Sequence, residues 1–161
     1  MFCFLPSGTI AGEFIRVIDA VQKKEISPQA IEALIKKGGD VNEKDEAGRT
    51  VLMLASIYHP VDSVHSVLIN HGADVNARTP DTGQTALFFA VRYNNPSVVL
   101  IYLSRGCNPE IKDVFGRTAY DYAERNPKMK DSDILKLFPQ YKERQETAVD
   151  AEASSDSGTS L

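Results

Sequence analysis

The sequence predicts an all-α solenoid, in which pairs of helices stack side by side and are joined by β-hairpin-like turns. The first observation is a segment of the pattern Gly-x-Thr-x-x-x-x-Ala that occurs three times, at spacings of 35 and 33 residues, starting at Gly48, Gly83 and Gly116. The second observation is another set of glycines, 34 residues apart, that alternates with the first: Gly38, Gly72 and Gly106. Two elements that share a period of about 34 residues indicate a stack of similar structural units.

The first helix of each unit begins after the threonine of this pattern. A threonine oxygen can accept a hydrogen bond from a free amide at the helix start, which favours a helix there. The alanine five residues later is small enough to let a neighbouring helix approach closely. These threonine and alanine pairs are Thr50 and Ala55, Thr85 and Ala90, and Thr118 and Ala123.

The second helix of each unit ends at the second set of glycines, because glycine adopts the left-handed conformation that closes a helix without steric penalty. A proline stands near each helix start, at the helical position where its missing amide costs nothing. These prolines are Pro28, Pro60, Pro96 and Pro127. The residues four and three positions before each glycine predict one buried face: Leu34 and Ile35, Leu68 and Ile69, and Tyr102 and Leu103. Projecting turns then connect the units at 45–48, 80–83 and 113–116.

Modified units are expected at both ends of the stack, since a repeat array needs polar outer faces there. Glu13 to Lys24 and Pro28 to Lys37 supply the two helices of the first unit, without a Gly-x-Thr element. In the last unit, a narrow apolar stripe that ends before Pro139 supplies the second helix: Ile134, Leu135, Leu137 and Phe138. The predicted organisation is an extension (1–12), a repeat domain (13–141, with units at about 13–43, 44–77, 78–111 and 112–141) and an acidic tail (142–161). The tail lacks apolar periodicity and is expected to be disordered.

Two helices and a projecting turn at this period resemble the ankyrin repeat, and the resemblance covers residues 13–141. The family's element Gly-x-Thr-Pro-Leu-His-x-Ala keeps its glycine, threonine and alanine in all three copies, and its element Gly-Ala-Asp-x-Asn is intact from Gly72 to Asn76. The family's proline is replaced by Val51, Ala86 and Ala119, and its histidine by Met53, Phe88 and Asp121. We therefore expect the ankyrin fold without the usual histidine ties between repeats. Met53 and Phe88 should act in packing, and Asp121 should bond to Thr118 or to a backbone amide.

The composition, with 42% hydrophobic and 25% charged residues, is that of a globular protein in solution. No apolar run approaches the ~20 residues that cross a bilayer, and no basic stretch precedes the apolar first residues, so we expect no membrane contact and a cytoplasmic location. The acidic residues of 145–161 account for the net charge of −4, and a pI near 5.4 argues against a nucleic-acid partner. Cys3 and Cys107 are too few for a disulfide framework and are expected to be reduced thiols.

No catalytic, phosphate-binding or metal-binding motif is recognisable in the sequence. His59, His65 and His71 are the only histidines, and His65 and His71 lie six residues apart on one predicted helix, so they point in roughly opposite directions. His65 stands at a position that is apolar in other units and is expected to be a structural histidine. The sequence therefore predicts a protein that is not an enzyme and that uses neither a metal nor a cofactor.

In ankyrin-like stacks, the turn tips and the exposed flank of the first helix line one concave surface that recognises protein partners. Carried over position by position, the resemblance implies these contact residues: Glu46, Arg49, Ile57, Tyr58, Asp81, Gln84, Arg92, Tyr93, Val114, Phe115, Arg117 and Arg125. Aromatic residues and arginines dominate binding hot spots, and Arg49, Arg92 and Arg117 favour an acidic partner. The alternative interpretation is structural, with Tyr58 and Tyr93 covering the edge of the core and the arginines solvated.

The resemblance thus implies a non-catalytic interaction module that acts as an adaptor, scaffold or inhibitor, in monomeric form. One alternative is a bacterial effector secreted into a host cell, or a regulatory protein, in which the acidic tail directs delivery. The residues Thr159 to Leu161 also fit a ligand for a PDZ domain, which captures a free carboxylate and an apolar last side chain. A further alternative is an oligomeric role, since the narrow stripe of the last unit leaves a face that a second copy could cover.

Overall fold

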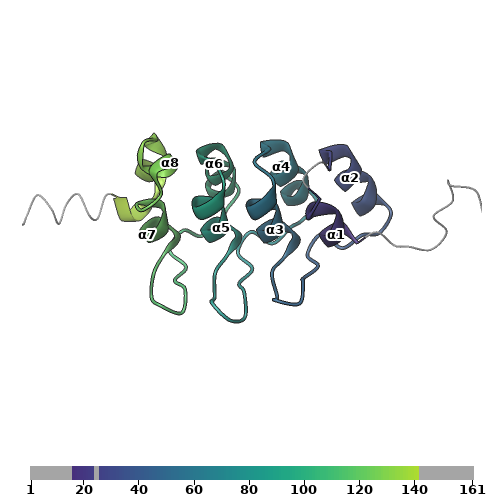
Figure 1. The fold of residues 1–161 in the computed structure, drawn as a ribbon, viewed down its shortest axis with the longest axis horizontal. Coiled ribbons are helices and arrows are strands. Elements are labelled where there is room, and N and C mark those ends of the chain that lie inside the picture. Colours follow the sequence, from purple (N-terminus) through teal and green to yellow (C-terminus); the bar gives the residue numbers. More distant parts are fainter. Residues whose placement is uncertain (1–15, 24–25, 142–161) are drawn as a thin grey trace, which may run out of the picture.

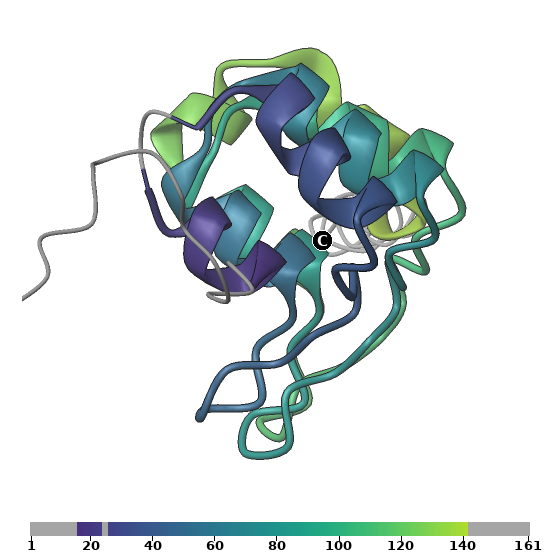
Figure 2. The ribbon, with the colours of Figure 1, turned by 90° about the vertical axis from the view of Figure 1, so that its right-hand side faces the viewer.

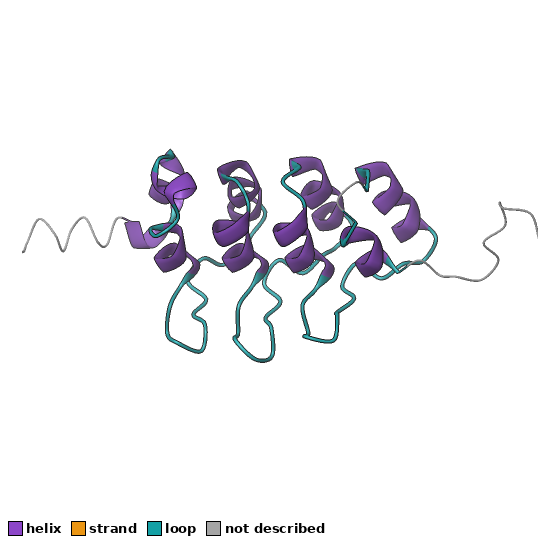
Figure 3. Ribbon diagram, in the orientation of Figure 1, coloured by secondary structure: helices purple, strands orange, loops and turns teal. Residues whose placement is uncertain are grey.

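The computed structural model describes residues 16–23 and 26–141 as two layers of helices with turns projecting from one side (Figure 1). The inner layer holds the first helix of each unit: α1 (Val17–Val21), α3 (Val51–Tyr58), α5 (Ala86–Tyr93) and α7 (Ala119–Ala123). The outer layer holds the second helices: α2 (Pro28–Lys36), α4 (Asp62–Asn70), α6 (Pro96–Ser104) and α8 (Pro127–Lys130), followed by the 3₁₀ helix η1 (Asp133–Leu137). No β-strand occurs within the described residues, so the predicted all-α solenoid is confirmed (Figure 3).

The units repeat along the stack with the same internal arrangement. Each inner helix packs against the next one, and the outer helices α2, α4 and α6 do the same. Viewed along the stack, the two layers lie side by side and the projecting turns extend away from them together (Figure 2). We call these turns tip 1 (45–48), tip 2 (79–83) and tip 3 (113–116).

The core lies between the two layers and confirms the predicted phase of the inner helices. Leu52 and Leu87 are fully buried, as are Met53 and Phe88, which pack where the family has its histidine. The outer helices bury less of the predicted face, because they cover the core from one side only. Leu68 and Tyr102 are buried there, whereas four of the paired positions are half-buried: Leu34, Ile35, Ile69 and Leu103.

The predicted glycine closure of the outer helices is confirmed. Gly38, Gly72 and Gly106 have φ angles of +97°, +89° and +82°, and each directly follows the last cap residue of its helix. A residue with a Cβ atom is strained in this region, so glycine is the residue that lets the chain reverse there.

The predicted helix starts are correct only in part. Thr50 Oγ1 accepts a hydrogen bond from the Met53 amide at 3.4 Å, but Thr85 makes no such cap. Thr118 instead donates from its amide and its hydroxyl to Asp121 Oδ2, at 2.7 and 2.9 Å, which confirms the expected partner of Asp121.

Three of the four prolines stand where they were predicted. Pro28, Pro96 and Pro127 are the first residues of α2, α6 and α8. The prediction for Pro60 is wrong, because α4 begins two residues later, at Asp62.

The two end units depart from their predicted helices. Of the predicted helix from Glu13 to Lys24, the structure describes residues 16–23, and within them the helix covers Val17–Val21. Residues 13–15 and 24 lie outside the described residues. In the last unit a short α8 precedes η1, and Leu137 is 53% exposed, so its place in the buried stripe is wrong. The 1–12 extension, Cys3 and the 142–161 tail also lie outside the described residues, and their assignments stay predictions.

Polar ties between neighbouring units persist although the family's histidine is absent. The donors stand just beyond the inner helices, where the chain turns toward the outer layer. His59 Nε2 lies 2.6 Å from the Val21 carbonyl oxygen, and Asn94 donates to the carbonyl of Ser56 at 3.1 Å. Asn126 donates to Val91 O at 2.6 Å, so every interface between the inner helices carries at least one such hydrogen bond. The expected loss of histidine ties is thus compensated from other positions.

His65 is a fully buried structural histidine, as predicted. Its Nδ1 lies 2.7 Å from the Tyr102 hydroxyl, and its Nε2 lies 2.8 Å from the carbonyl oxygen of His59. Ser56 Oγ completes the cluster, 2.7 Å from the Tyr102 hydroxyl. Burial disfavours the charged imidazolium and lowers the pKa of His65 from its ordinary value of 6.5 to about 4. Burial likewise raises the pKa of Tyr102, so this cluster is neutral at pH 7.

Candidate functional site

Tips 1 and 3 are built on an aspartate that organises its own turn. Asp45 Oδ1 accepts hydrogen bonds from the amides of Ala47 and Arg49, at 3.0 and 2.8 Å. Asp113 Oδ1 does the same for the amides two and four residues later, at 2.9 and 3.0 Å. In tip 2 the equivalent residue is Thr79, and one extra residue enlarges the turn, which explains the glycine spacing of 35 rather than 34.

Next to tip 3, aromatic rings and guanidinium groups alternate in contact with one another. The Arg92 guanidinium carbon lies 5.5 Å from the centre of the Tyr93 ring and 5.1 Å from that of Tyr122. The Arg117 guanidinium carbon lies 4.8 Å from the centres of both the Tyr122 and Phe115 rings. We call this continuous set, from α5 over α7 to tip 3, the arginine–aromatic ladder: Tyr93, Arg92, Tyr122, Arg117 and Phe115.

The ladder rests on a buried polar cluster centred on Asp113. Tyr122 donates its hydroxyl hydrogen to Asp113 Oδ2 at 2.6 Å, and Gln84 Nε2 lies 3.4 Å from the same oxygen. Burial alone would raise the pKa of Asp113, but the hydrogen bonds from Tyr122, Arg117 and Gln84 outweigh it and hold that pKa below its usual range. Burial and the bond to this carboxylate raise the pKa of Tyr122. The cluster therefore holds a charged aspartate and a neutral tyrosine in fixed positions.

Replacing Asp113 with alanine is expected to lower the free energy of unfolding by about 1 to 2 kcal/mol, because the Tyr122 hydroxyl and two backbone amides lose their acceptor. Urea unfolding followed by circular dichroism measures the change. Asp133→Ala is the matched control, since Asp133 forms an exposed ion pair with Lys136 and its loss should change stability little. Equal behaviour of the two variants would contradict the assigned role of Asp113.

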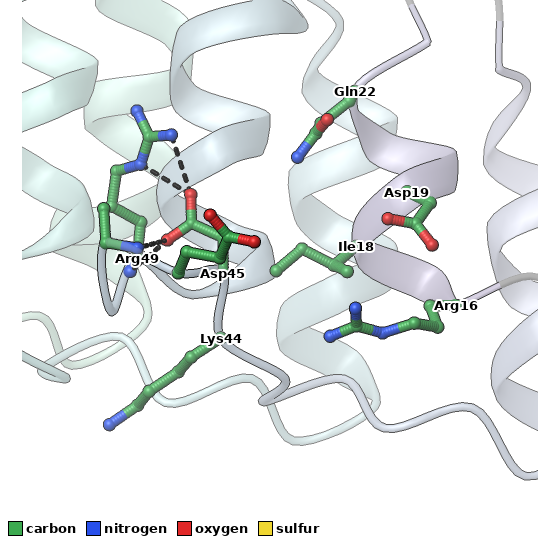
Figure 4. A pocket seen from close by; sticks show the side chains of 9 residues that line it. Arg16, Ile18, Asp19, Gln22, Lys44, Asp45 and Arg49 are labelled. Atoms are coloured by element: carbon green, nitrogen blue, oxygen red, sulfur yellow. Dashed lines mark hydrogen bonds and ion pairs between the residues drawn. The ribbon is translucent and has the colours of Figure 1, made fainter.

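Hollows in the surface of the described residues lie beside several of the predicted contact residues, and we describe two of them. The N-terminal hollow, of about 590 Å³, lies between α1 and tip 1 (Figure 4) and is lined by Arg16, Ile18, Asp19, Gln22, Lys44, Asp45, Glu46, Ala47 and Arg49. The C-terminal hollow, of about 360 Å³, lies beside the ladder and is lined by Arg92, Tyr93, Tyr122, Arg125, Asn126 and Pro127. These two hollows therefore lie toward opposite ends of the described stack.

The structure brings together seven of the twelve predicted contact residues in two groups. Arg92, Tyr93, Phe115, Arg117 and Arg125 belong to the ladder or to the C-terminal hollow. Glu46 and Arg49 line the N-terminal hollow. The concave site thus consists of an aromatic and basic end and an end of mixed charge.

The twelve predicted contact residues differ in exposure. Phe115 is 67% exposed, Tyr93 51% and Tyr58 37%, and Val114 and Asp81 are also exposed. The placement of Gln84 on the surface is wrong, because it is only 5% exposed and bonds inward to Asp113 and Tyr122. Ile57 is half-buried and packs against the core. The alternative in which Tyr58 and Tyr93 cover the edge of the core stays open, since both tyrosines are only partly exposed.

Tyr122 and Asp113 were missed as site residues. Tyr122 lies inside the predicted α7, four residues after Thr118, where the pattern indicates only a helix position. A sequence signal exists for Asp113: Asp113 and Arg117 have the same spacing as Asp45 and Arg49 of tip 1, which indicates that both turns are built in the same way.

The described residues hold no group of three or more histidine, cysteine or acidic side chains that could bind a metal ion. Among them there is also no helix whose length and apolarity would let it span a bilayer. Cys107 is a free, buried thiol, and burial raises its pKa to about 12, so it is protonated at neutral pH.

Four stacked helix pairs with projecting tips define a repeat protein of the class that mediates contacts between proteins. The chain belongs to the ankyrin-repeat family, since the family model for ankyrin repeats (3 copies) matches residues 17–113. Ankyrin repeats typically form non-catalytic protein–protein interaction modules.

Similar proteins carry the repeats within longer chains. The chain is 31% identical over 138 residues to BRCA1-associated RING domain protein 1 of Caenorhabditis elegans, covering 86% of this chain and 18% of the relative. It is 27% identical over 149 residues to the E3 ubiquitin-protein ligase hecd-1 of the same organism, covering 90% of this chain and 5% of the relative. It is 39% identical over 87 residues to the putative ankyrin repeat protein FPV031 of Fowlpox virus (strain NVSL), covering 53% of this chain and 25% of the relative. The chain thus spans a quarter or less of these relatives.

Proposed function

We propose that this chain is a non-catalytic adaptor or scaffold that binds a protein partner with an acidic surface through the concave side of its ankyrin stack. The observation that carries the proposal is the arginine–aromatic ladder, which ends at an exposed phenylalanine in tip 3. Phe115 contributes nothing to the core, and an exposed aromatic residue held in place by a neighbouring arginine is typical of binding hot spots. The monomeric state and the cytoplasmic location stay predictions from the sequence.

The fixed geometry of this surface supports recognition. Arg92 and Arg117 are held against tyrosine and phenylalanine rings, and Asp113 fixes Tyr122 between them. Side chains that are already ordered lose less conformational entropy when a partner binds, so a larger share of the contact energy appears as affinity. The name of hecd-1 as a ubiquitin ligase describes a much longer protein, and that activity is not proposed for this chain.

Replacing Tyr58, Tyr93 and Phe115 together with alanine is expected to weaken partner binding more than tenfold, since exposed aromatic anchors supply much of an interface's binding energy. The measurement is affinity capture from lysate with this variant and the wild type as baits, followed by titration of the captured partner. The helical circular dichroism signal and the melting temperature should stay near the wild-type values.

The matched control replaces three similarly exposed apolar residues elsewhere with alanine: Val61, Leu100 and Leu137. This variant should bind the partner like the wild type. A bait of residues 1–144 tests the alternative in which the acidic tail makes the contact. Unchanged affinity of the aromatic variant, or loss of the partner only from the shortened bait, would contradict concave-surface recognition.

A further inference from the structure

The arginines of the concave side differ in whether the protein itself neutralises them. Arg49 Nη2 lies 2.7 Å from Asp45 Oδ2, and Arg117 Nε lies 3.7 Å from Asp113 Oδ2. Arg92 and Arg125, in contrast, form no ion pair within the described part of the chain. Of Arg49, Arg92 and Arg117, to which the sequence pattern assigns the same role, Arg92 is therefore the one without an ion pair, and Arg125 adds a second unpaired arginine in the last unit.

These two unpaired arginines both line the C-terminal hollow, and no acidic residue stands among the described residues that line it. Tyr93 and Tyr122 supply aromatic walls beside them. Asn126 is committed elsewhere, since its amide donates to the carbonyl of Val91. The hydrogen-bond donors that the hollow offers to a ligand are thus chiefly guanidinium N–H groups, which match the two oxygens of a carboxylate.

Arg92 is held in position for this task without being neutralised. Its guanidinium stacks on two tyrosine rings, and its Nη1 lies 3.4 Å from the neutral Oε1 of Gln84. A ring or an amide orients a guanidinium but leaves its full charge, so an incoming carboxylate gains a preorganised cation.

The N-terminal hollow has a different electrostatic character. Arg49 reaches back to Asp45 along its wall (Figure 4). Arg16 pairs with Glu43, which lies outside the lining. Asp19 and Glu46 add negative charge to the same lining. This hollow therefore has no excess positive charge, and the two ends of the concave side differ in the charge they select.

We infer that the C-terminal hollow is a carboxylate-binding subsite that receives one aspartate or glutamate side chain from a peptide segment of the partner, with Arg92 and Arg125 as the specificity-determining residues. This inference rests on the proposed function and makes it more specific. Arg117 acts as a positioning residue, because it is paired with Asp113 and orders Tyr122 and Phe115.

Selection of a display library of random peptides against the full chain tests the inference. Peptides enriched on the wild type should share an aspartate or glutamate at one position. The variant Arg92→Glu/Arg125→Glu should select lysine or arginine at that position, because the charge of the hollow is reversed. The affinity of the acidic peptide for this variant should fall about tenfold or more, as is usual when a charge pair in an interface is reversed.

The control variant Arg105→Glu/Lys130→Glu changes the net charge by the same amount on the outer layer, where both residues are exposed. It should keep the acidic preference, and both variants should melt near the wild-type temperature. No acidic preference on the wild type, or an acidic preference that survives reversal of Arg92 and Arg125, would overturn the subsite. If peptides instead bind the Tyr58, Tyr93 and Phe115 alanine variant as well as the wild type, the concave surface itself fails as the binding site.

Discussion

Replacement of Leu87 by alanine is expected to lower the free energy of unfolding by about 2 to 5 kcal/mol. Leu87 is 0% exposed in α5, which packs against α3 on one side and α7 on the other. Truncation leaves a cavity in the middle of the stack, and a solenoid draws its stability from the interfaces between neighbouring units. A loss of this size is a large share of the stability of a small domain, so part of the variant is expected to be unfolded at room temperature.

The control for this prediction is Leu100→Ala, because Leu100 lies on the outer helix α6 of the same unit and is 49% exposed. Its truncation should cost less than about 1 kcal/mol. Urea unfolding followed by circular dichroism compares the two variants with the wild type. A cost below about 1 kcal/mol for Leu87→Ala, or equal costs for the two variants, would contradict the burial of Leu87 in the core.

Lowering the pH from 7 to 5 is expected to remove about 2 kcal/mol of stability through His65 alone. The folded chain holds His65 neutral between the Tyr102 hydroxyl and the His59 carbonyl, with a pKa of about 4. The unfolded chain takes up a proton near the ordinary pKa of 6.5. Between these values the unfolded state binds more protons, so the contribution of His65 is complete above pH 6.5 and is lost as the pH falls toward 4.

The variant His65→Gln isolates this effect, since glutamine offers a donor and an acceptor but does not titrate between pH 7 and 5. Between pH 7 and 5 the variant should lose about 2 kcal/mol less of its free energy of unfolding than the wild type loses. The control His71→Gln, at the C-terminal cap of the same helix, keeps the buried cluster, and this variant should lose as much stability as the wild type. If His65→Gln and the wild type lose stability in parallel, the low pKa of His65 is refuted.

The repeated parts of the fold could be predicted because the same types of residue recur at the same positions in each unit. Glycines at a fixed spacing mark helix ends that need a left-handed residue, and the apolar positions between them mark one buried face. The end units could not be predicted as well, because they occur once. The 3₁₀ helix η1, which packs against α6, and the exposed Leu137 have no counterpart in the other described units from which they could be predicted.

The candidate site was predicted by residue type but not by arrangement. The pattern placed Arg49, Arg92 and Arg117 in equivalent roles, whereas the structure neutralises the first and the third with aspartates of their own turns. Gln84 stands at the same tip position as these two arginines, yet it bonds inward because Asp113 of the next unit faces it. Tip 2 has Thr79 instead of an aspartate at its first position, so no carboxylate of its own turn faces Gln84. A contact between units such as that of Gln84 with Asp113 is not visible in a single repeat.

The sequence by itself determined the all-α solenoid, the period of the units, the helix closures and the side of the stack on which the aromatic and arginine residues lie. These features depend on local conformational preference and on periodicity, which are written in the order of residues along the chain. Only the tertiary structure decided the buried His65 cluster, the arginine–aromatic ladder and the division between neutralised and unpaired arginines. Each of these depends on side chains from different units meeting at a few ångströms, and burial and pairing at that distance set which charges a partner can reach.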